Sequence, residues 1–206
     1  MKSSAWLPSI YCRSSTKARS NVFVTIASVG KKAPYFSDEV KIQLPLIKPE
    51  HHLLLQVYHV ETKKPKKGED EIEAIVGYCV LPLTEILTST SHSMALIAGK
   101  PIPGYRKVSE RDLVDSGKAI LKLRTLLLSS IYTQNPDLNA FYKLIKGGDS
   151  DLAQAFQRLR NVPIEDLQKF FPIIVRELVT QMSTHPGAVG VQIFKVFMFV
   201  LNKLNK

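Results

Sequence analysis

Four lysines within five residues are the side chains in this sequence best placed to act together. The run Lys63–Lys67, interrupted only by Pro65, carries ammonium groups that attract the phosphate and carboxylate groups of an anionic surface. Pro65 disfavours a helix here, so we expect the lysines on a loop. A charge run is equally typical of a loop that is merely solvated, and the charge by itself does not separate the two interpretations.

A second basic pair, Lys31 and Lys32, precedes Ala33–Pro34 and is predicted to lie on another turn between strands. A lysine near an acidic membrane contributes about 1 kcal/mol, so six lysines would contribute roughly 6 kcal/mol at most. Selectivity for one headgroup would also require cations that converge on a shaped pocket. The candidate lipid-headgroup residues are Lys63, Lys64, Lys66, Lys67, Lys31 and Lys32.

Calcium is the first alternative, because carboxylates lie on both sides of the lysines in the sequence. Calcium needs carboxylates that converge from several loops. Here they lie close together in the sequence and no other loop is rich in aspartate, so we interpret them as a solvated flank that balances the charge of the lysines. These residues are Glu61, Glu69, Asp70, Glu71 and Glu73.

Other metals, cofactors and enzyme activity are not expected either. Adjacent residues of a strand point to opposite faces, so His51 and His52 are poor partners for one ion, and His59 lies at a strand end. Cys12 and Cys79 form no metal motif and no disulfide framework, which favours a reducing, cytoplasmic environment. Cys79 lies in a predicted strand, and we interpret it as a buried thiol. The sequence has no phosphate-binding glycine loop and no helical His–Glu pair.

Composition limits the class of partner. The chain has 206 residues, 45% of them apolar and 22% charged, with a formal net charge of +10. This is ordinary globular composition with a preference for anionic partners. Nucleic acid would call for aromatic residues interleaved with the basic ones, and the tyrosines are scattered, so it is not expected. The first residues do not resemble a signal peptide, and Val191–Leu201 is too short to span a bilayer.

From Val22 the apolar pattern is that of short strands separated by proline and glycine, which favours an antiparallel sandwich. Leu53–Val60 is apolar on both faces, so we expect it to be a central strand. The predicted strands are Val22–Ala27, Val40–Leu44, Leu53–Val60, Ile75–Leu81, Ser93–Ile97 and Ile120–Leu127.

After Thr133 the apolar period becomes helical. The predicted helices are Asp137–Lys146, Asp149–Arg160, a third that begins near Pro163–Ile164, and Val189–Leu204. Pro172 is expected to kink or divide the third helix. Val189–Leu204 is apolar on nearly all sides and therefore needs neighbours, which favours stacked helix pairs of a solenoid.

An ordered set of motifs resembles one family, the DOCK (dedicator-of-cytokinesis) exchange factors, over roughly residues 24 to 146. The resemblance is to their DOCK homology region 1, a phosphoinositide-binding C2 domain, with the zizimin branch the nearest in character. The motifs are Pro34–Pro45, His51–Val60, Val76–Leu83, Pro103–Tyr105 and Ser129–Pro136.

The resemblance implies a β-sandwich of C2 type, antiparallel and N-terminally incomplete, followed by an armadillo-like helical segment. The expected organisation is an unassigned, disordered stretch 1–20, a partial C2 domain 21–132 and helices 133–206. It also implies that the loop of residues 63–67 lies at the membrane-facing end and contacts acidic phosphoinositides. Proteins of the family exchange nucleotide on Rho-family GTPases such as Rac and Cdc42 through a separate region, which has no match here, so the chain is not expected to be an enzyme.

Two rival interpretations stay open. One is a protein-interaction scaffold, which uses a bare strand edge and the apolar helix Val189–Leu204 as a partner surface. The other is a generic calcium-independent C2 lipid binder without a role in GTPase control. Both predict a cytoplasmic protein. The interpretations that include lipid binding also predict that it is recruited to the membrane surface.

Overall fold

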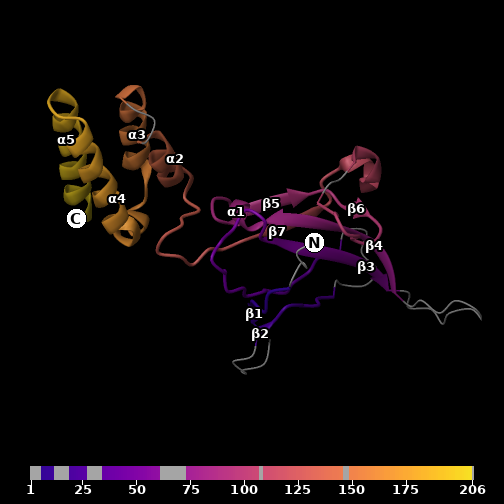
Figure 1. Cartoon of the computed structure of the whole chain (residues 1–206). Coiled ribbons are helices and arrows are strands. Elements are labelled where there is room, and N and C mark those ends of the chain that lie inside the picture. Colours follow the sequence, from indigo (N-terminus) through magenta and orange to yellow (C-terminus); the bar gives the residue numbers. More distant parts are fainter. Residues whose placement is uncertain are drawn as a thin grey trace, which may run out of the picture. The chain divides into compact units, whose positions relative to one another are not determined.

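The computed structural model describes residues 6–11, 19–26, 34–60, 73–106, 109–145 and 149–205. The chain divides into two compact units, Met1–Lys48 and Pro49–Lys206, which are treated separately below. Their helices and strands are labelled in Figure 1.

The first unit contains one short antiparallel pair, β1 (Ile10–Tyr11) with β2 (Arg19–Ser20). Ile10 also forms an isolated antiparallel bridge with Ile42. Beside that bridge, the Tyr11 amide donates to the Lys41 carbonyl at 2.9 Å. β1 and β2 lie within residues 1–20, where the sequence has no period that would have predicted them.

Two predicted strands of this unit are wrong in their extent. Val40–Leu44 contributes only the bridge at Ile42, and the described part of Val22–Ala27, residues 22–26, has no strand pairing. Val22, Val24 and Ile26 are exposed. An alternating apolar pattern becomes a strand only when its backbone pairs with a neighbouring strand, and no described strand pairs with residues 22–26.

The main sheet of the second unit has the order β3–β4–β6. β3 (His52–Val60) and β4 (Glu73–Pro82) form a long antiparallel hairpin, visible in Figure 1, and β6 (Ile97–Ala98) pairs with Gly77 and Tyr78 of β4. The central strand of the described sheet is therefore β4, and the expectation that Leu53–Val60 is central is wrong. The first four residues of β3 are partly buried, whereas its last four residues are largely exposed.

Gly77 shows why β6 can pair so closely with β4. A methyl group at this position would lie 2.5 Å from the Ile97 carbonyl oxygen, well inside normal contact. Glycine is thus required by the close approach of the neighbouring backbone.

The predicted strand Ser93–Ile97 is divided between two sheets. β5 (Ser91–Met94) pairs with β7 (Leu121–Arg124) in a two-stranded sheet, whereas β6 belongs to the main sheet. Between β5 and β6, Leu96 is buried and its carbonyl accepts from the Val114 amide at 2.8 Å. The chain changes sheet at Leu96, which a periodicity argument cannot detect.

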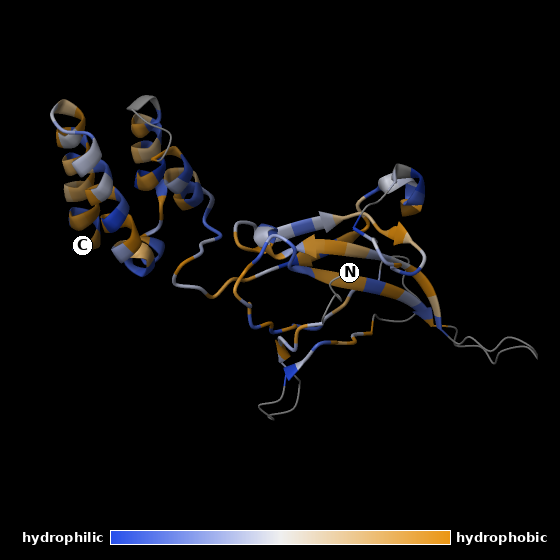
Figure 2. Ribbon diagram, viewed as in Figure 1, coloured by the Kyte–Doolittle hydropathy of each residue, from blue (hydrophilic) through white to orange (hydrophobic). Residues whose placement is uncertain are grey.

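Short helical turns complete this part of the unit. They are α1 (Leu83–Ile86), η1 (Glu110–Asp112) and η2 (Val114–Gly117). The apolar core runs along β4 into α1, and its buried residues are Tyr78, Cys79, Leu81, Leu83, Ile86, Leu87 and Leu96. Figure 2 shows the corresponding hydrophobic colouring along β4.

All four predicted helices are present, as α2 (Pro136–Leu144), α3 (Asp149–Asn161), α4 (Ile164–Thr184) and α5 (Ala188–Leu204). α2 packs against α3, and α4 against α5. The apolar residues at helical spacing form one core, in which Leu138, Phe141, Ile145, Leu159, Leu167, Phe170, Ile174 and Leu178 are buried and Tyr142 and Phe156 partly buried.

Pro172 does not divide the third helix, because α4 continues through it. Proline removes one backbone donor, which leaves the carbonyl of Gln168, four residues earlier, without its helical partner. Both residues lie on the exposed side of α4, where water can satisfy that carbonyl. No helix among the described residues is both long enough and apolar enough to cross a membrane.

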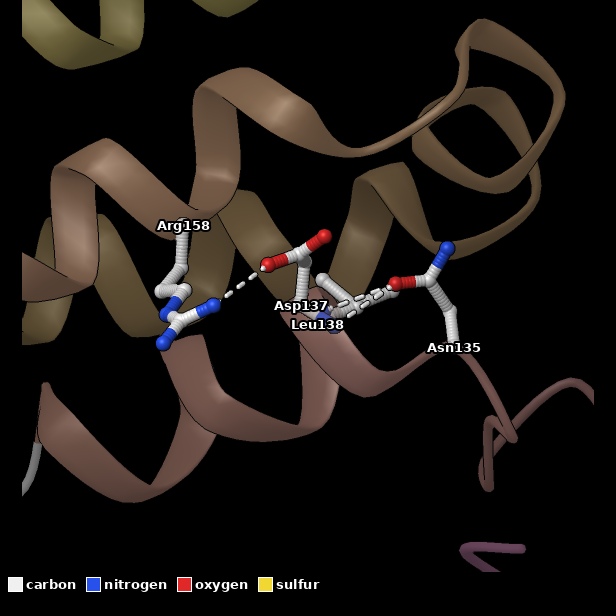
Figure 3. Close-up of polar contacts among 4 residues, drawn as sticks. All are labelled: Asn135, Asp137, Leu138 and Arg158. Carbon is white, nitrogen blue, oxygen red and sulfur yellow. Dashed lines mark hydrogen bonds and ion pairs between the residues drawn. The ribbon is translucent and has the colours of Figure 1, made fainter.

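Polar side chains fix the segment between β7 and α2. Asn135 caps α2 by accepting from the amides of Asp137 and Leu138, both at 3.0 Å, as Figure 3 shows. The Gln134 amide group donates to the carbonyls of Ile86 and Ser89 at 2.8 and 2.9 Å. Its oxygen accepts from the Leu127 amide at 2.9 Å, so one side chain satisfies groups from three segments.

Candidate functional site

The predicted lipid-headgroup site lies outside the described residues. Lys63, Lys64, Lys66 and Lys67 belong to the segment 61–72, and Lys31 and Lys32 to the segment 27–33, neither of which is described. The site therefore stays a prediction, and the structure describes only the elements that lead to the first segment.

Those elements are the ends of the hairpin. β3 and β4 stay paired up to Val60 and Glu73, which are partners in the ladder and bracket the segment 61–72. The register shifts between Val57 and Tyr58, where Val57 faces Gly77 and Tyr58 faces Ile75. Val76 is thus the extra residue of a β-bulge, a feature that bends a strand and re-aims its side chains.

We call residues 58–60 with 73–76 the hairpin arm. The described pairing of β6 with β4 involves Gly77 and Tyr78 and does not extend to the arm, so the arm is a two-stranded ribbon. Three of its apolar side chains, Tyr58, Val60 and Val76, are exposed. The apolar pattern of Leu53–Val60 predicts burial on both faces and therefore gives no indication that Tyr58 and Val60 are exposed, although a tyrosine and a valine beside a lysine run were a usable signal.

A polar cluster lies near the other end of β3. The His52 Nδ1 is 2.7 Å from the Glu50 carbonyl, which can only accept, so Nδ1 carries a proton. In the neutral ring, Nε2 then accepts from the Tyr105 hydroxyl at 2.8 Å. Tyr78 donates to the Tyr105 carbonyl at 3.3 Å, and burial, with smaller contributions from Asp112 and Tyr105, raises its pKa.

This cluster has a structural use. Its contacts hold the turn at Gly104 and Tyr105 against β3 and β4, and Gly104 has a positive φ of 90° that suits glycine. His52 is thus occupied as a structural residue. Within the described ranges, no group of three histidine, cysteine or acidic residues could hold a metal ion.

Burial also makes two further titratable groups less reactive. It raises the pKa of the Cys79 thiol to about 11, and the Cys79 Sγ lies 3.8 Å from the sulfur of Met94. Burial likewise raises the pKa of Tyr142, with a further contribution from Glu177. A thiol that stays protonated is a poor nucleophile, so Cys79 is a core residue.

Comparison with known proteins identifies the source of the motifs. The family described as "C2 domain in Dock180 and Zizimin proteins" matches residues 2–137. The match thus includes most of the stretch 1–20 that sequence analysis left unassigned, and the expected domain boundaries stay predictions.

Several curated relatives match most of the chain. Guanine nucleotide exchange factor SPIKE 1 of Arabidopsis thaliana is 28% identical over 88% of the chain and 10% of its own length. Dedicator of cytokinesis protein 9 of Homo sapiens is 31% identical over 77% of the chain and 9% of its own length. Dedicator of cytokinesis protein 7 of Mus musculus is 24% identical over 97% and 11%. The chain spans about a tenth of the length of these relatives.

Proposed function

The chain belongs to the family of C2 domains in Dock180 and Zizimin proteins, and we propose that it targets a guanine nucleotide exchange factor to membranes that contain acidic phosphoinositides. In this proposal the lysines of residues 63–67 contact the lipid headgroups without calcium, and Lys31 and Lys32 assist. The protein is cytoplasmic and binds the membrane from its surface.

The observation that carries the proposal is the hairpin. β3 and β4 are paired up to Val60 and Glu73, and the segment between these two residues contains the four lysines. Four ammonium groups tethered to one paired end favour an anionic surface over a single anion, since a planar surface can meet them all. Within the same segment, Glu61 precedes the lysines and Glu69, Asp70 and Glu71 follow them, so the lysines form a basic run between acidic residues.

Vesicle co-sedimentation tests this proposal. We expect the chain to bind phosphatidylcholine vesicles that contain phosphatidylinositol trisphosphate, and a variant with Lys63, Lys64, Lys66 and Lys67 changed to alanine to lose that binding. A control variant with Lys100, Lys118, Lys122 and Lys143 changed to alanine removes the same charge from exposed positions elsewhere. Equal losses in the two variants, or binding that ignores the headgroup, would leave only diffuse attraction and contradict the proposed site.

GTPase partnership is proposed for the whole protein only. We expect residues 1–206 alone not to accelerate nucleotide release from Rac or Cdc42, because the C2 domain supplies location and a separate region supplies exchange. A fluorescent-nucleotide release assay checks this. Robust acceleration of nucleotide release by residues 1–206 would contradict the proposal that a separate region carries out exchange.

A second candidate function, protein interaction, is favoured by α5. Its buried side holds Ile193, Val196 and Val200, while its other side exposes Val191, Phe194 and Met198 at helical spacing. An apolar stripe of this kind suits a further helix or a protein partner. Vesicle binding that does not depend on the lysines of residues 63–67 would favour this scaffold function.

A further inference from the structure

We propose that the hairpin arm inserts apolar side chains, chiefly Tyr58 and Val60, into the boundary between headgroups and acyl chains of an anionic membrane. This inference rests on the proposed function, because it specifies how the lipid-binding end of the hairpin engages the bilayer. It concerns only described residues of the arm and adds an apolar contact to the electrostatic one.

The geometry of the arm gives it an apolar face. Tyr58 stands directly opposite Ile75, and Val60 opposite Glu73. Directly opposed residues project from the same face of a ribbon, and residues two apart on one strand share a face. Tyr58, Val60 and Ile75 therefore lie on one face, and Glu73 is the single charged residue among these four positions.

That face is not used to build the core. Tyr58 is 47% exposed and Val60 is 53% exposed, and Val76 at the bulge is 40% exposed. Each residue beyond the bulge lies outside the described pairing with β6, which ends at Gly77. The three side chains are therefore available to an external apolar phase.

The charge pattern identifies that phase as a bilayer. Lys63 follows Val60 by three residues, with Glu61 and Thr62 between them, so at most about 10 Å of chain separates the exposed apolar residues from the first lysine. Adjacent apolar and basic groups match the layered chemistry of an anionic membrane, where acyl chains lie beneath phosphate groups. Tyrosine suits this depth because its ring is apolar and its hydroxyl stays at the polar level.

Fluorescence provides a direct test, because the chain has one tryptophan, Trp6. In a Trp6→Phe background, Tyr58→Trp places a reporter on the arm. Val179→Trp places a control reporter on α4, where Val179 is 50% exposed. Each protein is mixed with vesicles of phosphatidylcholine, phosphatidylserine and phosphatidylinositol trisphosphate, with and without bromine on the acyl chains. We expect brominated chains to quench the reporter at 58 and not the one at 179.

Binding measurements supply a second readout. The double variant Tyr58→Ser, Val60→Ser should bind these vesicles roughly tenfold more weakly, since two half-exposed apolar side chains lose their transfer into the membrane. The matched control Tyr132→Ser, Val179→Ser removes a tyrosine and a valine of similar exposure from positions outside the arm and should bind normally. Circular dichroism confirms that each variant is folded before its binding is compared.

The outcomes separate this inference from the proposed function. If the wild-type chain binds through its lysines but bromine does not quench position 58 and the double serine variant binds normally, insertion is wrong and lipid binding stands. That result is also expected if a protein surface covers the arm instead. If the wild-type chain does not bind the vesicles at all, the proposed function fails and insertion fails with it.

Discussion

Cys79 illustrates at the scale of one residue how burial controls chemistry. Its thiol is enclosed in β4, and the resulting loss of hydration raises its pKa from 9.0 to about 11. In a Cys12→Ser background, we expect Cys79 of the native protein to react with a disulfide reagent at pH 8 at least about tenfold more slowly than that of the urea-unfolded protein. Equal rates in native and unfolded protein would contradict a buried thiol.

The same shift predicts the sign of a pH dependence. Above pH 9 the unfolded chain releases the thiol proton, whereas the native protein keeps it until about pH 11. The native state then binds more protons, so this contribution to stability is complete below pH 9 and is lost as the pH rises towards 11. We therefore expect the free energy of unfolding, measured by urea denaturation, to fall less between pH 8 and pH 10 for Cys79→Ala than for the parent protein.

At the scale of elements, Gln134 joins the end of the sheet region to the start of α2. Its amide group donates to the carbonyl of Ile86, the last residue of α1, and to that of Ser89 just beyond it, and accepts from the backbone after β7. We expect Gln134→Ala to lower the free energy of unfolding by about 1–3 kcal/mol, because partly buried backbone groups lose their partner. Urea denaturation followed by circular dichroism measures the change.

The control for this prediction is Gln192→Ala, which removes the same side chain from an exposed position on α5. It should change stability by less than about 0.5 kcal/mol. A similar decrease in the free energy of unfolding for both variants would show that the hydrogen bonds of Gln134 do not stabilise the protein.

At the scale of the whole molecule, the excess of positive charge controls association. The net charge of +10 should draw the chain to phosphatidylserine vesicles even without a phosphoinositide. The screening length falls from about 10 Å at 0.1 M salt to about 3 Å at 1 M, so this background binding should disappear at high salt. Headgroup-dependent binding should fall less if the hairpin arm inserts, which co-sedimentation across a salt series measures.

Several features could be predicted from the amino-acid sequence by itself. The four helices and their buried stripes are confirmed, because a helical period is a local property of ten to twenty residues. The C2-like class with antiparallel sheets followed by helices is also confirmed, and it followed from ordered motifs. Two of these motif residues have clear local roles in the structure: Gly77 permits close strand pairing, and Asn135 caps α2.

Only the tertiary structure decided which strands pair and which side chains are left outside. β3 lies at the edge of the described sheet, the predicted strand Ser93–Ile97 divides between two sheets, and residues 22–26 form no strand pairing with the described residues. The tertiary structure also shows that Tyr58 and Val60, in a strand that the sequence predicts to be apolar on both faces, are exposed. Strand pairing joins residues far apart in the chain, and an apolar period of two cannot tell a strand with two neighbours from a strand with one.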